Sequence, residues 1–572
     1  MPATVAPVVI HLGSFVTMEP SFPTAEAVAV RDGRIVAVGS LAQVRSALGD
    51  EPFELDETLS GLTVLPGFID QHLHPILGAS TLATEVVSIE EWVLPGRTFA
   101  AATSAQEYRS RIADAVAAMP PLSSAPGTVP PDAEWFFSWG YQALWHGPLD
   151  RAALDAISTT RPVVVWQRSC HEWYLNTAAI EALGIDEASV QGHGDASTMV
   201  DLAAGHWWET GMNLLLPVLM PHFLTPARLV RGLQQMVAYL HLNGVTAYNE
   251  PGALFTPDMW TLYQGILGAP DTPFTSYFLV DGRAQVDAGL PLADTLADAE
   301  KQVALAPPGS GKLEFFDKQI KLFADGAIIS QLMQMKDPYL DAAGRPDPAH
   351  HGAWLITPEH LEERTKLYWD AGWQIHCHVN GDEGLDVLLD ILERRMRENP
   401  RADHRSVIVH FANSTPEQVD RIARLGAIVS ANPYYTTQFA DAYGQVGLGP
   451  VRADAMVRSA DVLAAKVPLS FHSDLPMGPS SPLNFVWCAV NRLTVSGRVA
   501  APEQRIGVHD ALRAITIEAA YSWRKEHEIG SIAPGKQATF TALGEDPYTV
   551  APEHLRDIPV VGTMYQGRWF PV

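Results

Sequence analysis

The segment "TPEHLEERTKLYWDAGWQIHCHVNGDEGLDVLLDILERRMRENP", residues 357–400, predicts a helix, a strand and a second helix in succession. Thr357 and Pro358 form a typical N-cap and first helical position, and Gly372 predicts the end of that helix. "WQIHCHV" is short and apolar enough to form a buried strand. Leucines then recur at helical spacing along one face, which indicates an amphipathic helix.

Other parts of the chain repeat this alternation. The strand "SVIVHF" precedes Ser414-Thr-Pro-Glu417, a pattern similar to a capping box, and Gly426 precedes the strand "AIVSANP". A helix of about residues 225–242 leads through Gly244 into "VTAYNE". Repeated units of this size indicate a parallel sheet, either doubly wound or closed. Polar residues lie at the strand ends and no glycine-rich phosphate loop follows them, so we predict an α/β fold, a distorted (β/α)8 TIM barrel.

The two chain ends read as strands and tight turns. "AEAVAVRDGRIVAVG" places alternating runs on either side of Asp32-Gly33, and Gln566-Gly567 marks a second turn near the C-terminus. We predict one small β-sandwich domain made from residues 1–64 and from residues 511–572, the second segment beginning with a final helix. The barrel then occupies residues 65–510, with an Ala-, Pro- and Ser-rich insertion of about residues 80–165 after its first strand.

Composition excludes several classes of partner. The chain has 572 residues, 39 Lys plus Arg, 65 Asp plus Glu and a net charge of -26, which argues against nucleic acid. Its three cysteines, Cys170, Cys377 and Cys488, are far apart and predict no disulfide framework. Without a basic signal region or a membrane-length apolar run, we expect a cytoplasmic protein that acts on a small molecule, with a homodimer left open.

Side chains that bind metals lie at the ends of several predicted strands. "LPGFIDQHLHP", residues 65–75, ends in His72 and His74, and His378, His410 and Asp474 end later strands. A single histidine of this kind is more often a hydrogen-bonded polar group at the rim of the core. A barrel, however, brings its strand ends to one point, and imidazole and carboxylate groups bind Zn²⁺ and similar ions. The agreement among four strands therefore favours a metal site.

Lys321, in "DKQIKLFADG", is the exception among these strand residues, because an ammonium group repels a cation. It could join a metal site only as a neutral amine or as a carbamate formed with CO2. The alternative is an ordinary solvated or ion-paired lysine.

"LPGFIDQHLHP" resembles the opening signature of the amidohydrolase superfamily. The blocks "IKLFADGA", "HVNGD", "VIVHFANSTPE", "SDLPMGPSSPL" and "GSIAPGK" follow in the order typical of the branch that includes N-substituted formamide deformylase. Two departures lie near the site, Val409 in place of a frequent glutamate and His472 in place of a frequent glycine; Thr539 is a third, in the last block. The resemblance implies one or two divalent ions, with zinc favoured, held by a set that includes a carboxylated lysine: His72, His74, Lys321, His378, His410 and Asp474.

The activity implied is hydrolysis of a non-peptide C–N bond in an amide, N-acyl or N-formyl group by metal-bound hydroxide. Asp474 would transfer the proton of the water to the leaving nitrogen, and His171, in "RSCHEWYLN", would donate a hydrogen bond to the oxyanion. Aromatic residues around these motifs suggest a small apolar or aromatic substrate. Three further residues are candidates for substrate binding: Trp173, Glu209 and His472.

Two alternatives remain open at this point. One is another metal-dependent reaction on the same scaffold, namely deamination, ester or lactone hydrolysis, or decarboxylation. The other is a metal-free binding protein that has kept the fold.

Overall fold

The structure is a computed structural model that describes residues 7–122, 134–252 and 256–572. The chain divides into two compact units, which we describe separately. Unit 1 consists of Met1–His74 and Leu240–Val572, and unit 2 of Pro75–Tyr239. Within the described ranges, every helix is too short or too polar to cross a membrane.

Unit 1 contains an eight-stranded parallel barrel, which confirms the predicted distorted (β/α)8 fold. Its last strand meets its first where the Gln71 N–H donates to the Phe471 carbonyl at 3.4 Å, so that the barrel is nearly closed. The strands, in spatial order, are β6 (Phe68–Asp70), β15 (Val245–Glu250), β16 (Thr275–Asp281), β17 (Leu313–Phe323), β18 (Gln374–Val379), β19 (Val407–His410), β20 (Ile428–Ala431) and β21 (Leu469–Phe471).

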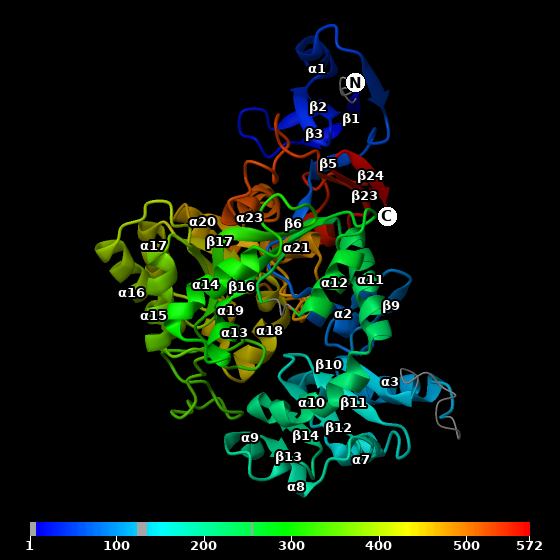
Figure 1. Ribbon diagram of the computed structural model, residues 1–572, viewed down its shortest axis with the longest axis vertical. Helices are drawn as coiled ribbons and strands as arrows, with labels where there is room; N and C mark the ends of the chain where they lie inside the picture. The colour runs from blue at the N-terminus through cyan, green and yellow to red at the C-terminus, as the bar shows by residue number, and fades with distance from the viewer. Residues whose placement is uncertain (1–6, 123–133, 253–255) are drawn as a thin grey trace. The chain divides into compact units, whose positions relative to one another are not determined.

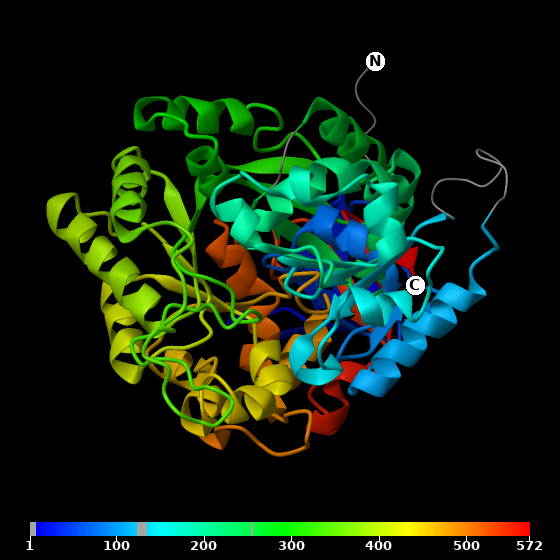
Figure 2. The ribbon, with the colours of Figure 1, turned by 90° about the horizontal axis from the view of Figure 1, so that it is seen from below.

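Helices follow most of these strands and form the outer layer, drawn green through yellow to orange in Figure 2. They are α12 (Pro257–Ile266), α13 (Gly282–Asp287), α14 (Leu292–Val303), α15 (Pro358–Asp370), α16 (Asp382–Glu398), α17 (Pro416–Leu425), α18 (Tyr434–Gln445), α19 (Pro450–Asp454), α20 (Ser459–Ala464), α21 (Pro482–Asn491), α22 (Val508–Ala514) and α23 (Ile517–Ser522), with short 3-10 turns at Pro502–Gln504 and Pro552–Asp557.

The ends of these helices follow their local sequence. The Thr357 side chain caps α15, as predicted, and four leucines of α16 are buried on one face. The prediction for α17 was wrong by one residue. Pro416 occupies its first position, so the capping box is formed by Thr415 and Gln418 instead of Ser414 and Glu417.

Both chain ends join one β domain, as the sequence predicts, with the blue N-terminal and red C-terminal strands in the same sheet (Figure 1). Asp32-Gly33 and Gln566-Gly567 form the two expected hairpin turns, with positive φ at all four residues. Both faces of the sheet carry buried apolar clusters, one of them packed on α1 (Leu41–Leu48). The strands are β1 (Val8–Val16), β2 (Thr24–Arg31), β3 (Arg34–Gly39), β4 (Phe53–Asp56), β5 (Thr63–Pro66), β22 (Phe540–Leu543), β23 (Val560–Tyr565) and β24 (Arg568–Pro571).

Unit 2 lies between β6 and β15 in the chain, which confirms an insertion after the first barrel strand. Its sheet contains β13 (Val200–Asp201), β14 (His206–Trp208), β12 (Glu172–Leu175), β11 (Val163–Gln167), β10 (Phe136–Tyr141) and β7 (Glu85–Val86) in spatial order. Because β11 pairs with β10, and β12, β14 and β13 then extend the same sheet in that order, the compact unit is longer than the expected insertion of about residues 80–165.

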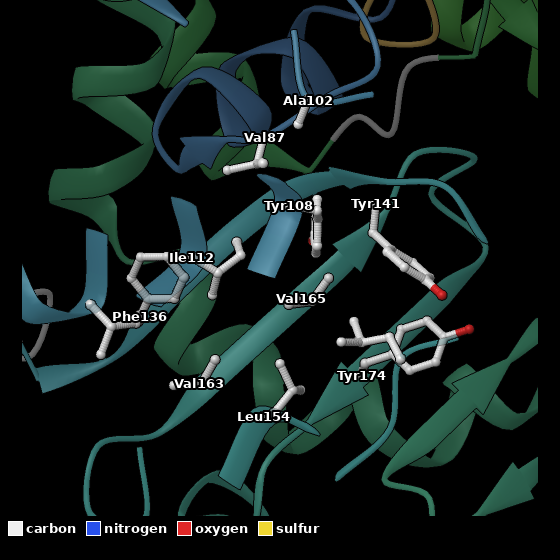
Figure 3. Packing of buried hydrophobic residues seen from close by; sticks show 12 residues of the cluster. Val87, Ala102, Tyr108, Ile112, Phe136, Tyr141, Leu154, Val163, Val165 and Tyr174 are labelled. Carbon is white, nitrogen blue, oxygen red and sulfur yellow. The ribbon is translucent and has the colours of Figure 1, made fainter. Parts of the chain in front are cut away.

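Aromatic and aliphatic side chains fill the core of unit 2 (Figure 3). Tyr141 and Tyr174 pack edge to face there, with ring centroids 5.1 Å apart. The remaining elements of the unit are a small hairpin of β8 (Trp92–Leu94) and β9 (Arg97–Phe99), and α2 (Pro75–Leu82), α3 (Ala105–Ala118), α5 (Ala143–His146), α6 (Arg151–Asp155), α7 (Thr177–Ala182), α8 (Glu187–Val190), α9 (Asp195–Thr198), η1 (Glu209–Gly211), α10 (Met212–Phe223) and α11 (Pro226–Leu242).

Candidate metal centre

Two histidines and one carboxylate converge at the carboxyl ends of the first and last barrel strands. Nε2 of His72 and Nε2 of His74 each lie 3.3 Å from the same oxygen, Oδ1 of Asp474. Bonds of about 2.0–2.2 Å to a tetrahedral Zn²⁺ separate neighbouring ligand atoms by roughly 3.3 Å. The types of these three ligand atoms and the distances between them therefore fit a divalent metal ion.

Backbone pairing between two loops brings these ligands together. The strand β6 ends at Asp70, so the prediction that His72 and His74 end a strand was wrong, and both residues lie in the loop beyond it. The Asp474 N–H donates to the His72 carbonyl at 2.9 Å, and the His74 N–H donates to the Leu475 carbonyl at 3.0 Å. Asp474 also lies beyond β21 and has a φ of 59°, in the left-handed region that side chains usually avoid.

Asp70 anchors the loop that carries Asp474. Its carboxylate accepts hydrogen bonds from the Ser473 N–H at 2.9 Å and from the hydroxyls of Ser473 and Ser480, both at 2.6 Å. Burial raises the pKa of Asp70 to about 6, although these hydrogen bonds favour the charged form. Sequence reasoning did not single out Asp70, although it is the acidic residue of the "PGFID" motif.

Glu250, at the end of β15, orients His74. Its Oε1 lies 2.9 Å from Nδ1 of His74, which leaves Nε2 of that ring directed at Asp474. Burial opposes protonation of His74, but Glu250 and Asp474 outweigh it and raise the pKa of His74 to about 10. Positive charge is therefore stabilised between His74 and Asp474. A metal ion could occupy that position in place of the proton on Nε2 of His74. Sequence reasoning missed Glu250, although it is an acidic residue at the end of the strand "VTAYNE".

His378 and His410 join the same cluster. The centroids of their rings are 4.3 Å apart, and the His410 ring is 5.0 Å from that of His72. Nδ1 of His410 lies 3.8 Å from Oδ2 of Asp474. Burial lowers the pKa of His378 and of His410 well below the usual value, so both rings are neutral and carry a lone pair for a ligand.

Lys321 is buried in β17 and is only 1% exposed. Its Nζ has no hydrogen-bond partner among the described residues and lies 5.2 Å from the centroid of the Phe323 ring. Burial lowers the pKa of Lys321 to about 8, although nearby acidic groups, first among them Asp474, act in the opposite direction. An unpaired buried amine with this pKa is available as the neutral base near neutral pH.

His472 is completely buried behind His410. Its Nδ1 lies 2.9 Å from the Ser430 hydroxyl and its Nε2 lies 3.1 Å from Nδ1 of His410. The phenol oxygen of Tyr435 lies 3.4 Å from the same His410 nitrogen. Because both ring nitrogens of His472 face protein groups, its contacts favour a positioning role over the expected contact with substrate.

The remaining candidates lie in unit 2. Nδ1 of His171 lies 3.1 Å from Oε2 of Glu209, and both side chains are partly exposed. Trp173, a candidate for substrate binding in the sequence, is buried within this unit. It is 2% exposed and stacks on Trp166 with ring centroids 4.9 Å apart, because it faces the interior of this unit.

The chain matches the model of the Amidohydrolase family over residues 58–570. A second model, the imidazolonepropionase-like composite domain of bacteria, matches residues 27–48. Among curated relatives, the Protein LONG AFTER FAR-RED 3 of Arabidopsis thaliana is 26% identical, over 95% of this chain and 88% of its own. The N-substituted formamide deformylase of Arthrobacter pascens is 27% identical, over 95% of this chain and 94% of its own.

A solved structure supports the fold. The crystal structure of an uncharacterized metal-dependent hydrolase from Pyrococcus horikoshii aligns with a TM-score of 0.71 at 20% identity and covers 96% of this chain and 99% of that chain. At this identity the alignment establishes a shared fold. The family model spans the barrel, unit 2 and the C-terminal strands of the β domain, and the chain therefore belongs to the amidohydrolase family of metal-dependent hydrolases.

Proposed function

We propose that this chain hydrolyses a non-peptide C–N bond in a small amide, N-acyl or N-formyl compound. The observation that carries the proposal is the cluster of His72, His74 and Asp474, where two imidazole nitrogens share one carboxylate oxygen at 3.3 Å. A relative that is 27% identical over nearly the whole chain is named N-substituted formamide deformylase, which supports an amide substrate with a substituted nitrogen.

The ligands proposed for the metal are His72, His74, His378, His410 and Asp474, with Lys321 as a carbamate. A divalent ion at such a site, for which we favour zinc, lowers the pKa of a bound water to about 7 and polarises a substrate carbonyl. The surroundings of Lys321 support a carbamate at this position. Its amine is buried, has no hydrogen-bond partner among the described residues, and has a pKa of about 8. With that bridging group the centre could hold two ions, and without it one.

Asp474 is the proposed proton carrier. One of its oxygens, Oδ1, faces both His72 and His74, while Oδ2 faces His410 at 3.8 Å. A water that attacks the substrate carbonyl would give its proton to Asp474, which would then pass it to the leaving nitrogen as the C–N bond breaks. Glu250 would keep Nε2 of His74 directed at Asp474 throughout.

His171 is the proposed donor to the developing oxyanion, with Glu209 as its partner. The 3.1 Å contact between Nδ1 of His171 and Oε2 of Glu209 would orient the imidazole for this hydrogen bond. We do not assign Trp173 to the substrate, because its ring is stacked inside unit 2. The buried cysteines Cys377 and Cys488 are free thiols, which supports our proposal that the protein is cytoplasmic.

The experiment that tests the function combines metal analysis with a substrate panel. Purified protein is assayed by elemental analysis and then with matched N-formyl, N-acyl, cyclic amide, ester and lactone compounds that carry the same aryl or alkyl group. We expect one or two divalent ions per chain and amine release from the amides. Turnover of esters or lactones alone would move the assignment to those substrates, and full activity of a protein that contains no metal would contradict the proposal.

A further inference from the structure

A chain of buried polar side chains leads from the last helix of the barrel to His410. We call Ser522, Gln71, Ser430 and His472 the relay, and each of them is at most 1% exposed. Gln71 follows β6, Ser430 lies in β20, His472 follows β21, and Ser522 ends α23. Because none of the four side chains is exposed to solvent, their polar atoms must form hydrogen bonds with other protein groups.

The direction of the first two hydrogen bonds follows from a backbone carbonyl. The Ser522 hydroxyl donates its one hydrogen to the Ala519 carbonyl at 2.8 Å. Its oxygen can therefore only accept from Gln71, whose Nε2 lies 3.2 Å away. The amide of Gln71 is thereby oriented with Oε1 toward Ser430, at 2.7 Å, where it accepts the hydroxyl hydrogen of Ser430.

The donors in the next two hydrogen bonds, which involve the rings of His472 and His410, follow from the first two. Since Ser430 has used its hydrogen, it must accept at the 2.9 Å contact with Nδ1 of His472, and that nitrogen carries the proton. A neutral imidazole has one N–H, so Nε2 of His472 is an acceptor. Nδ1 of His410, 3.1 Å away, must then be the donor. The remaining nitrogen of His410, Nε2, keeps its lone pair.

We propose that Gln71 and Ser430 are positioning residues that hold His410 as the Nδ1–H tautomer and so reserve its Nε2 for the metal. The relay explains why His472 is completely buried and why polar residues occupy the interior of the barrel beneath the site. The role assigned to Nε2 rests on the proposed function, whereas the tautomer itself is a property of the metal-free protein. Hydrogen-bond partners behind a ligating histidine commonly set its tautomer and change metal affinity by about 10- to 100-fold.

The test uses Gln71→Met, which keeps the length of the side chain but removes its amide. The Ser430 hydroxyl can then rotate and donate to Nδ1 of His472, so both tautomers of His472 and of His410 become accessible. Metal-free full-length protein labelled with 15N-histidine is measured at pH 8, above the ordinary pKa of histidine. Protonated and unprotonated ring nitrogens are distinguished by their 15N shifts, with His410 and His472 assigned by single substitution.

A matched control exists on β17, in another part of the same barrel. Gln319 is also a buried glutamine whose Oε1 contacts a buried histidine, Nε2 of His376 at 2.9 Å, but it lies outside the relay. Gln319→Met removes the same group at the same depth and should leave the tautomer of His410 unchanged. Ser430→Ala should reproduce the effect of Gln71→Met, and Ser430→Thr, which keeps the hydroxyl, should restore the single tautomer.

We expect Nδ1 to be protonated in both rings of the wild-type protein and a mixture in Gln71→Met. We also expect zinc affinity, measured by competition with a chromophoric chelator, to fall about tenfold in that variant. Protonation of Nε2 of His472 in the wild-type protein, or a single unchanged tautomer in Gln71→Met and Ser430→Ala, would overturn the proposal. A wild-type protein that binds no metal would contradict the proposed function instead. The 15N shifts of the metal-free protein would still show which tautomer His410 and His472 adopt.

Discussion

At the scale of single residues, one carboxylate oxygen of Asp474 decides the chemistry of the site. His72 and His74 both face that oxygen at 3.3 Å, and Glu250 holds His74 from the opposite side. These groups favour a bound cation, because the carboxylates of Asp474 and Glu250 contribute negative charge in a buried place. Substitutions here should therefore act on metal binding before they act on the fold.

Removal of one histidine should release the metal. For His72→Ala we expect no stoichiometric metal and loss of hydrolysis, with an affinity loss beyond the roughly 100-fold that an outer hydrogen-bond partner costs. Elemental analysis and turnover of the active substrate measure both effects. The control is His376→Gln, since His376 is equally buried but bonds to Gln319 instead of Asp474. Retention of metal by His72→Ala would be incompatible with our assignment of this ligand.

Loss of the Glu250 charge should weaken the metal without unfolding the barrel. In Glu250→Gln the pKa of His74 should fall, because Glu250 is one of the groups that raise it to about 10. Metal affinity should drop by about 10- to 100-fold, measured by chelator competition at constant pH. Glu314→Gln, a buried carboxylate on β17 that bonds to Lys525, serves as the control. Equal affinity losses in the two variants would argue against an orienting role for Glu250.

At the scale of secondary structure, capping chemistry separates what the sequence could predict from what it could not. The Thr357 cap and the Gly426 terminus follow from residue types alone. The cap of α17 does not, because Ser414 and Thr415 are both good caps and only the position of Pro416 distinguishes them. Ser414 lies nearly buried with no hydrogen-bond partner for its hydroxyl among the described residues.

This difference can be measured directly. Thr415→Ala should lower the free energy of unfolding of the barrel by about 1 kcal/mol, the usual cost of a lost N-cap, in urea titrations followed by circular dichroism. Ser414→Ala should have a smaller effect, because the Ser414 hydroxyl caps no helix in the structure. The reverse order would mean that α17 begins one residue earlier than the structure places it.

His146, at the end of α5, makes the stability of unit 2 depend on pH. Its Nδ1 accepts the Gln142 N–H at 3.0 Å and its Nε2 donates to the Ala102 carbonyl at 2.8 Å. Burial lowers the pKa of His146 to about 4, below its value of about 6.5 in the unfolded chain. Between these values only the unfolded chain gains a proton, so stability should fall as the pH drops from about 6.5 to 4, by up to about 3 kcal/mol.

The measurement is hydrogen exchange of the amides of Phe136–Tyr141 at several pH values, after correction for the intrinsic rates. His146→Gln should flatten the pH dependence, since glutamine does not titrate. The exposed His527, changed to Gln, provides the control and should leave it unchanged. A slope that survives in His146→Gln would assign the effect to another group.

At the scale of the whole chain, the barrel joins residues that are distant in sequence. The ligands proposed for the metal come from positions 72 to 474, and they meet because β21 closes against β6 through Gln71 and Phe471. The convergence of His378 and His410, at strand ends, and of Asp474, just beyond β21, could be predicted from the sequence, since a parallel barrel places all such ends on one face.

Other parts of the site were beyond sequence reasoning. Asp70 and Glu250 act through hydrogen bonds to loops whose course depends on tertiary packing, and no periodicity marks them. Trp173 looks like a pocket residue in the motif "CHEWYL", yet the pairing of β12 with β11 and β14 turns it into the interior of unit 2. The direction of the hydrogen bonds in the relay likewise depends on contacts between four separate segments.

The central claim is that a divalent ion lies between His72, His74 and Asp474 and carries the hydrolysis. Anomalous diffraction from crystals of the active, metal-loaded protein, recorded above and below the absorption edge of the ion found by elemental analysis, tests it most directly. We predict a peak about 2.0–2.2 Å from Nε2 of His72, Nε2 of His74 and a carboxylate oxygen of Asp474, with density extending beyond Nζ of Lys321. An active crystal with no anomalous peak between these three residues would contradict the account.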